Sequence, residues 1–299
     1  MMVTVQRLNH VRRDRLLATS VQDRHVLLIG CTDQKGLVHQ ITGVLFRAGL
    51  NIVRNGEFVD EENSRFYMRT EFEGDVESDI LQNQLVDVVP EGAWIQLLVP
   101  RSKGIVVLAT KEHHCLGDLL LRHVHGDLNA SIKAVVSNHE RLGELVRKFD
   151  VPFHHVSHKG LSRIEHEIKL RTILGRFSFD YLVLAKYMRI LSSEFVSTFE
   201  NKIINIHHSF LPAFIGANPY RQAFERGVKI IGATAHFVTN DLDEGPIIVQ
   251  SVLPVDHRKS ARDMARAGRE VERAALVRAL DLVLEDQVVV VDNRTIVFE

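Results

Sequence analysis

The chain has 299 residues, of which 45% are hydrophobic and 25% are charged, and its formal net charge is −1. This length suits two domains, and the ordinary globular balance argues against disorder. A nearly neutral chain has no electrostatic reason to bind nucleic acid or an anionic membrane. Because no apolar run approaches the roughly 20 residues of a transmembrane helix, we expect a cytoplasmic globular protein without nucleic-acid or membrane partners.

The two cysteines, Cys31 and Cys115, are far apart and form no CxxC pair. That spacing indicates a reducing compartment, with no disulfide framework and no zinc knuckle. Residues 1–24 are polar and basic and lack the apolar core of a secretory signal. We expect them to form an N-terminal tail, with an Arg-rich transit peptide as the alternative.

The segment 25–99 predicts an α+β domain. Helical spacing of apolar residues predicts one helix over 33–49 and another around 80–88. Short runs of strand-forming residues predict strands at 25–30, 51–59, 64–72 and 93–99. The resulting order, βαββαβ, is the ferredoxin-like plan.

Beyond a short predicted linker at 100–104, strands alternate with helices. The predicted strands are at 105–109, 132–137, 153–155, 181–185, 203–206 and 232–238. This repetition predicts a doubly wound, mostly parallel α/β domain over 105–299, with its ligand site at the carboxyl ends of the strands. The chain closes with a predicted helix over 260–285 and a hairpin formed by 288–291 and 295–298.

Two polar stretches near predicted strand ends carry groups suited to catalysis. Asn205 and His207, two residues apart, project to the same side of an extended chain. An amide donor beside an imidazole can polarise a carbonyl and move a proton at one centre, although both residues could instead only cap the loop.

The acidic loop 241–246 ends in Gly-Pro, and its oxygens are too irregularly spaced for calcium, so no metal site is expected. A carboxylate brought from this loop to His207 would orient the imidazole.

Together these stretches resemble the catalytic core of folate enzymes with the formyltransferase fold. The matching segments are IINIHHSFLPAFIGANPYRQA at 203–223 and GVKIIGATAHFVTNDLDEGPIIVQ at 227–250. That family pairs an N-x-H at a strand end with an aspartate from a later LDxGP loop, which implies Asn205, His207 and Asp243 as catalytic residues. The resemblance, which extends to LAKYMRIL at 184–191, also implies folate-binding residues: Met188, Arg189, Leu191, Val196, His236, Val238, Thr239, Asn240 and Asp241.

More specifically, the chain resembles the formyltetrahydrofolate deformylase branch of this family. The supporting features are the doubled histidine at 207–208, where glycinamide ribonucleotide transformylases have His-Pro, the continuation FLPAFIGA, and a preceding ACT-like domain at 25–99. The resemblance implies hydrolysis of 10-formyltetrahydrofolate to formate and tetrahydrofolate for one-carbon and purine metabolism, with no metal and no cofactor. The alternatives are an amine-dependent formyltransferase and a non-enzymatic sensor. A nicotinamide dehydrogenase is disfavoured because the loop after 105–109 lacks GxGxxG.

The loop at 110–117, TKEHHCLG, bears on the choice between water and an amine as acceptor. The transformylases have a glycine- and serine-rich, GSNLQ-like run there, whose backbone N–H groups can converge on a phosphate. This chain has bulky side chains instead, and Glu112 would repel a phosphate. Lys111 or a protonated histidine could still attract an anion, but water is the expected acceptor.

The ACT resemblance implies amino-acid effectors, with methionine and glycine as opposing signals, bound between paired domains near the first strand–helix loop. The expected contacts are Asp33 and Gly36 in that loop, with Asn51 and Ile52 from the next strand. Asp33 could instead only cap the helix, and Gly36 could be a turn residue. Paired domains also imply a homo-oligomer, at least a dimer.

Several other histidines have no assigned role, including His208. His113 and His114 could face the pocket, and His154 or His155 could line the cleft from a strand end. His123 and His125, two apart on a predicted helix, point to different faces and cannot jointly bind a metal.

Overall fold

The computed structural model describes residues 24–213 and 218–299. All but the last residue of the expected tail, and the FIGA part of the FLPAFIGA motif, therefore lie outside the described residues. The chain divides into two compact units: the first ends at Arg101 and includes Phe298 and Glu299, and the second spans Ser102–Val297. Within the described ranges, no helix combines the length and apolarity needed to cross a membrane.

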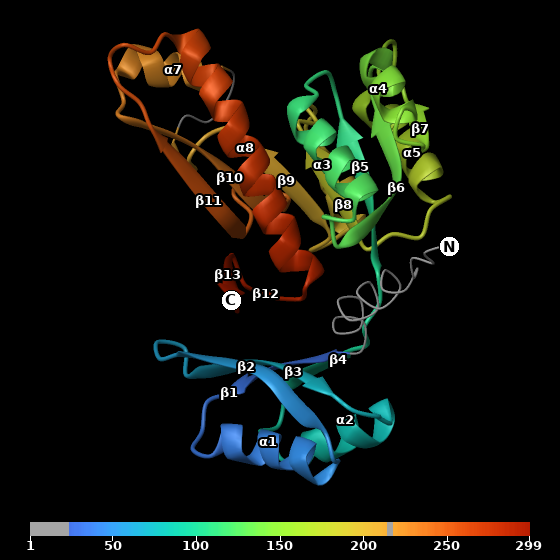
Figure 1. Cartoon of the computed structure of the whole chain (residues 1–299), viewed down its shortest axis with the longest axis vertical. Helices are drawn as coiled ribbons and strands as arrows, with labels where there is room; N and C mark the ends of the chain where they lie inside the picture. Colours follow the sequence, from blue (N-terminus) through green and yellow to red (C-terminus); the bar gives the residue numbers. More distant parts are fainter. Residues whose placement is uncertain (1–23, 214–217) are drawn as a thin grey trace, which may run out of the picture. The chain divides into compact units, whose positions relative to one another are not determined.

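The first unit has the expected βαββαβ order. Its elements are β1 (His25–Thr32), α1 (Leu37–Arg47), β2 (Asn51–Asp60), β3 (Arg65–Glu73), α2 (Ser78–Val86) and β4 (Trp94–Leu98). The four strands form an antiparallel sheet in the order β2-β3-β1-β4. Both helices cover one face of this sheet (Figure 1), where Leu27, Ile41 and Phe72 belong to a buried cluster.

The start of α1 differs from the prediction. The helix begins at Leu37, four residues later than expected, and its N-cap position is Gly36 rather than Asp33. Gly36 has a φ of +90°, a conformation that favours glycine because it has no side chain. The interpretation of Asp33 as the helix cap is therefore wrong; its backbone N–H donates to the carbonyl of Ser64 at 2.9 Å.

The second unit contains a seven-stranded sheet in the order β11-β10-β9-β8-β5-β6-β7. The strands are β5 (Lys103–Ala109), β6 (Ala130–Ser137), β7 (Phe153–His155), β8 (Tyr181–Ala185), β9 (Ile203–His207), β10 (Ile230–Phe237) and β11 (Ile247–Pro254). Five neighbouring strands, β7, β6, β5, β8 and β9, are parallel, whereas β10 runs antiparallel to both of its neighbours. β5 begins two residues earlier than expected because Lys103 and Gly104 already pair with β6.

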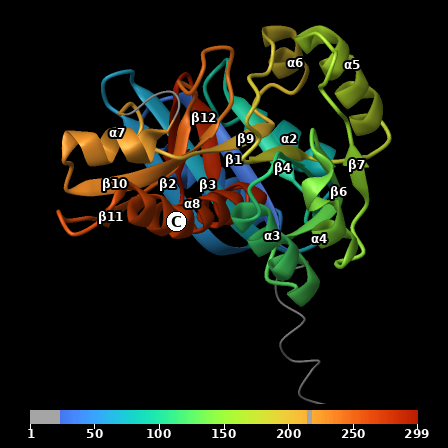
Figure 2. The ribbon, with the colours of Figure 1, turned by 90° about the horizontal axis from the view of Figure 1, so that it is seen from above.

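Helices cover both faces of this sheet, which confirms the doubly wound plan. They are α3 (His114–His125), the short helices η1 (Glu140–Leu142) and α4 (Gly143–Arg147), α5 (Arg163–Leu174), α6 (Ser193–Thr198), α7 (Pro219–Arg226) and α8 (Ala261–Leu284). Alternate residues of β5 enter different cores: Val107 packs with α3, α4 and α8, and Val106 packs with α5 and α6. Figure 2 shows α3 and α4 on one side of the sheet and α5 and α6 on the other.

The C-terminal elements are close to the prediction. Ser260 caps α8 through a capping box with Asp263, which explains why the long helix begins there. The hairpin strands are β12 (Val288–Val291) and β13 (Arg294–Val297), and Asp292 between them has a φ of 51°. β11 was not predicted, because only one of its eight residues is buried and its sequence shows no clean alternation.

Candidate active site

The antiparallel pairing of β9 with β10 brings the first group of polar residues together. In this register Asn205 lies opposite His236, and His207 lies opposite Thr234. His236 Nδ1 lies 2.8 Å from the carbonyl oxygen of Phe237, an interaction that requires the proton on Nδ1. His236 Nε2 is then the acceptor for Asn205 Nδ2 at 3.2 Å, and the second N–H of the amide is left for another acceptor.

The acidic loop after β10 places a carboxylate against His207. Phe237 N–H donates to the carbonyl of Pro246 at 2.9 Å, which closes the loop. Gly245 is needed for this closure, since a Cβ there would lie 1.9 Å from the Phe237 carbonyl oxygen. Asp243, with a φ of 59°, then points an oxygen at His207: Oδ1 lies 3.2 Å from Nδ1.

The electrostatics of this group keep the carboxylate charged and leave one imidazole nitrogen open. Burial raises the pKa of Asp243, but the hydrogen bond and charge of His207 outweigh it, so the pKa lies below its ordinary value. His207 is only 6% exposed, and its Nε2 is buried without a hydrogen-bond partner among the described residues. Burial lowers the pKa of His236, which favours its neutral form.

A separate network fixes the turn that follows His207. The buried Thr234 hydroxyl donates to the carbonyl of Ser209 at 2.9 Å and accepts from the N–H of Leu211 at 3.1 Å. Gln250 on β11 donates to the carbonyl of Leu211 at 3.0 Å. The turn is therefore held by both antiparallel strands, which restricts movement of the histidine beside it.

The expected folate-binding residues lie in two loops that share a hydrophobic support. Leu191, Val196 and Val238 all pack against the cluster beneath α5 and α6. Val196 is itself buried, so its side chain supports the loop rather than facing a ligand. Asn240 and Asp241 are exposed, and the Thr239 hydroxyl donates to the carbonyl of Asp241 at 3.3 Å.

Met188 and Arg189 line a cavity at the carboxyl ends of β5, β6 and β8. The Met188 N–H donates to the Thr110 hydroxyl at 3.0 Å, which ties the loop after β8 to the loop after β5. The cavity has a volume of about 370 Å³ and is lined by Thr110, Lys111, Glu112, Asn138, His139, His158, Met188 and Arg189. It lies where the strand order reverses, the usual ligand position in doubly wound sheets.

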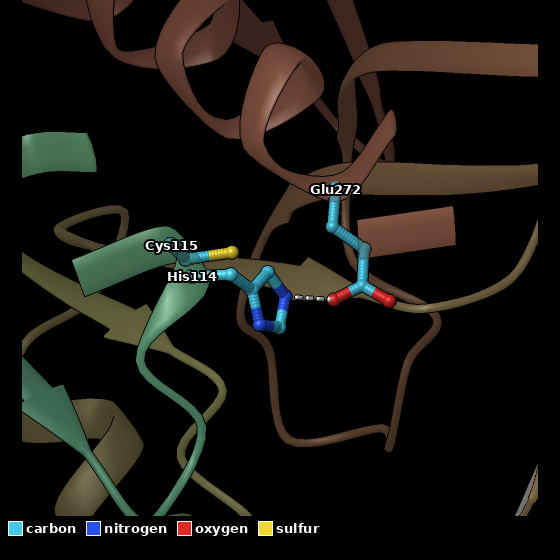
Figure 3. A group of neighbouring side chains, drawn as sticks. All are labelled: His114, Cys115 and Glu272. Carbon is cyan, nitrogen blue, oxygen red and sulfur yellow. Dashed lines mark hydrogen bonds and ion pairs between the residues drawn. The ribbon is translucent and has the colours of Figure 1, made fainter. Parts of the chain in front are cut away.

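A buried ionic cluster beside this site was not predicted. Glu272, on the buried stripe of α8, accepts hydrogen bonds from Tyr220 Oη at 2.6 Å and His114 Nε2 at 2.7 Å. Figure 3 shows the His114 ring, at the start of α3, directed at this carboxylate. Lys186 Nζ lies 3.2 Å from the same oxygen that contacts His114. We call these four residues the Glu272 cluster.

The charge of Glu272 is stabilised by its neighbours. Burial raises the pKa of its carboxyl group, but the hydrogen bond from His114, the charge of Lys186 and the hydrogen bond from Tyr220 together lower it to about 2. Ligand atoms of His114, Cys115 and Glu272 lie within 4.8 Å of one another, a spacing that a metal ion could use. Lys186 already occupies the same carboxylate, however, and burial raises the pKa of the Cys115 thiol, so we assign no metal here.

The Glu272 cluster adjoins His207 through His208. The ring centroid of His208 lies 5.1 Å from that of His207 and 6.3 Å from that of Tyr220. Burial, followed by the charges of Lys186 and His207, lowers the pKa of His208 to about 4, so this ring is neutral at physiological pH. His208 therefore lies between His207 and the Glu272 cluster, a position that the sequence did not predict.

The other histidines lie apart from His207. His113 is exposed just before α3. His154 packs edge-on against Phe177 at a centroid distance of 5.6 Å, and His155 Nδ1 lies 3.4 Å from Glu140. Among the described residues, neither contacts the catalytic candidates.

In the first unit, the four expected effector contacts do not meet within one chain. Gly36 and Asp33 follow the end of β1 at Thr32, which pairs with Arg65. Asn51 begins β2 and pairs with Glu73, at the other end of β3. Asn51 and Ile52 are therefore not partners of the Asp33 loop in the same chain, because α1 carries the chain back along the sheet before β2 starts.

Comparison with known proteins identifies the families to which the two units are similar. The formyl transferase family matches residues 103–280, and the ACT domain family matches residues 25–85. A formyltetrahydrofolate deformylase from Haemophilus influenzae is 52% identical over 275 residues, which cover 92% of this chain and 99% of the relative.

Solved structures separate the two branches of the fold. The crystal structure of a formyltetrahydrofolate deformylase from Pseudomonas syringae is 37% identical, with a TM-score of 0.88 and coverage of 96% of this chain and 98% of that one. The crystal structure of a glycinamide ribonucleotide transformylase from Symbiobacterium toebii is 32% identical, with a TM-score of 0.64. That match covers 95% of the transformylase but only 66% of this chain. The match to the deformylases extends over both units, and the chain therefore belongs to the formyltetrahydrofolate deformylase family.

Proposed function

We propose that this protein hydrolyses 10-formyltetrahydrofolate to formate and tetrahydrofolate, with Asn205, His207 and Asp243 as the catalytic residues. The observation that carries the assignment of residues is the pair formed by His207 Nδ1 and Asp243 Oδ1 at 3.2 Å, beside an amide donor on the same strand. His236 positions that amide at 3.2 Å. The reaction needs only water as a second reactant, so the proposal requires no metal and no redox cofactor.

Asp243 and His207 activate the water. Among the described residues, Asp243 Oδ2 has no hydrogen-bond donor, and this oxygen can hold a water molecule beside the formyl carbon. His207 removes the proton as the water oxygen attacks, and the resulting imidazolium is stabilised by Asp243. The neighbouring His208 is kept neutral by burial, so it does not compete for that proton.

Asn205 stabilises the charge that develops on the formyl oxygen. One N–H of its amide is directed to His236 and the other remains for the substrate, so the donor is already oriented before the reaction starts. Collapse of the tetrahedral intermediate breaks the bond between carbon and N10. Return of a proton from His207 to N10 then gives tetrahydrofolate and formate.

Folate would bind between the loop after β8 and the loop after β10. We assign Met188, Arg189 and Leu191 to one wall of this pocket, and Val196 supports that wall from the core. The opposite wall would be formed by His236, Val238, Thr239, Asn240 and Asp241. The shared packing of Leu191, Val196 and Val238 supports this arrangement, because it holds the two loops against one cluster.

Incubation of the purified protein with 10-formyltetrahydrofolate alone tests the function. Stoichiometric formate and tetrahydrofolate are expected, and an Asp243→Asn variant should be slower while remaining folded. If formate appeared only when an amine was supplied, together with its formylated product, the protein would be a transferase. If folate bound without any turnover, it would be a sensor.

We also propose that the first unit binds small amino acids between two copies of the chain, in a cytoplasmic homo-oligomer. Asp33 and Gly36 lie at one end of its sheet and Asn51 and Ile52 at the other, so a ligand that touches both sets needs a second copy. Methionine and glycine are the effectors to test first. Sedimentation velocity with and without each amino acid, beside the formate assay, would reject this proposal if the protein were monomeric and its rate unchanged.

A further inference from the structure

Two polar side chains beside the catalytic candidates come from the segments that follow the carboxyl ends of β5 and β8. These ends lie at the point where the strand order reverses, and α/β enzymes usually bind a ligand there. Lys186 directly follows β8, and His114 begins the helix that follows β5. Both side chains turn into the protein and meet on Glu272, with 7% and 9% of their surfaces exposed.

We propose that the Glu272 cluster determines acceptor specificity, because it fills the space beside His207 through which an amine would reach the formyl group. The inference rests on the proposed hydrolysis at His207. Asp243 covers the Nδ1 side of His207 and is itself contacted by His236. Another side is occupied by His208, which lies next to Tyr220 of the Glu272 cluster.

The volume of the cluster opposes an amine acceptor, because its charges compensate one another. The single carboxylate is matched by one ammonium group and by two further donors, at 3.2, 2.7 and 2.6 Å. A charged amine would find no free counter-charge here, since the carboxylate and the ammonium group already pair with one another. A water molecule carries no charge and needs little room, so the same cluster does not exclude it.

Lys186 has a backbone conformation that is unusual for a residue with a side chain. Its φ of 61° is in the left-handed region, which costs a non-glycine residue free energy and persists only where the surroundings impose it. Glycine would take this conformation without strain. In this conformation the lysine side chain makes a buried contact with Glu272 that glycine could not make.

The test is the partition of the formyl group between water and a small amine. Wild-type protein and variants are incubated with 10-formyltetrahydrofolate and either glycinamide or hydroxylamine, and both formate and the formylated amine are measured. Lys186→Gly removes the ammonium group and fits the backbone, and His114→Ser removes bulk from the other edge. Each should raise the ratio of formylated amine to formate by about 10- to 200-fold, the range that steric discrimination gives.

Two controls separate the effect of side-chain volume on this ratio from the effects of charge and of backbone strain. The double variant Lys186→Met with Glu272→Gln removes both charges but keeps the volume, so its ratio should stay close to that of the wild type. Asp150→Gly relieves a similar left-handed backbone, with a φ of 55°, at an exposed position, and it should change nothing.

The possible outcomes distinguish this inference from the proposed function. If the wild type released no formate, the proposed function would fail before any variant was made. If it released formate but the ratio did not change in folded Lys186→Gly and His114→Ser, the cluster would not control the acceptor. If the lysine variant did not fold, His114→Ser alone would decide. A stoichiometric transition metal in the purified protein would also overturn the inference, since a metal on Glu272 would displace Lys186.

Discussion

Two buried pairs of histidine and carboxylate lie in the same domain and differ in how fully the carboxylate is occupied. Asp243 has 14% of its side chain exposed, and its nearest contacts are both histidines, His207 at 3.2 Å and His236 at 3.8 Å. Glu272 has 1% exposed, and both of its oxygens hold donors from Tyr220, His114 and Lys186.

This difference separates a group that can react from a group that fixes structure. A carboxylate with an open oxygen can bind and orient a water, whereas one with three donors would have to break a contact first. Strong perturbation of a pKa therefore does not coincide with the proposed reactive site. The larger shift belongs to Glu272, whose pKa is lowered to about 2 by groups that hold it in place.

Exchange of the two histidines for alanine gives the largest contrast. His207→Ala should lower turnover by about 10²–10⁴-fold, the usual effect of losing a general acid–base group, with little change in thermal stability. His114→Ala should do the reverse: it removes one donor from the buried Glu272 carboxylate and costs about 1–3 kcal/mol of unfolding free energy. Turnover and urea unfolding of both variants provide the comparison. Equal losses of turnover would contradict the division of roles.

Neutralisation of Glu272 tests whether its cluster acts as one unit. Glu272→Gln leaves the Lys186 ammonium buried without its counter-charge, and breaking a buried pair in this way costs about 3–5 kcal/mol. Lys186→Met in the same protein should recover part of that loss, since neither charge then remains. A double-mutant cycle in urea measures the coupling. Additive losses would show that the two side chains do not stabilise one another.

Removal of the amide donor should have a somewhat smaller effect. Asn205→Ala is expected to reduce turnover by about 10²–10³-fold, the cost of one oxyanion donor, with the binding of folate largely kept. Asn83→Ala, at an exposed position of α2, is the matched control and should leave the rate unchanged. Single-turnover kinetics separate the chemical step from binding. A loss confined to substrate affinity would make Asn205 a binding residue instead.

Regular periodicity made most of the fold predictable. The βαββαβ unit, the parallel strands and the long helix α8 all follow apolar patterns that the sequence shows clearly. β11 has no clean pattern, because most of its side chains are only partly covered. The start of α1 was misplaced since a left-handed glycine, Gly36, precedes the helix in place of a polar cap.

The two pairs also differ in what the sequence reveals. Asn205 and His207 are two residues apart on one strand, and Asp243 lies in a recognisable loop, so local patterns were enough to propose them together. The contact between His114 and Glu272 joins positions 158 residues apart. One signal was nevertheless present: Glu272 interrupts the apolar stripe formed by Gly268, Val271, Ala275 and Leu276 on α8. A charge on the buried face of a helix requires a partner, but the sequence does not name it.

Acid unfolding should show the smallest difference between the two carboxylates, with the same sign for both. Glu272 has a folded pKa of about 2 against an ordinary 4.5, so its stabilisation is complete above about pH 4.5 and is lost as the pH falls toward 2. The unfolding free energies of wild type and Glu272→Gln should therefore converge over that interval. The pKa of Asp243 is also lowered, but burial opposes its histidine contacts and the carboxylate is more exposed, so Asp243→Asn should converge with the wild type by a smaller amount and only below about pH 4. Urea titrations at several pH values from about 3 to 6 measure both differences. A larger pH-dependent term for Asp243 than for Glu272 would mean that the open carboxylate, not the occupied one, holds the domain together.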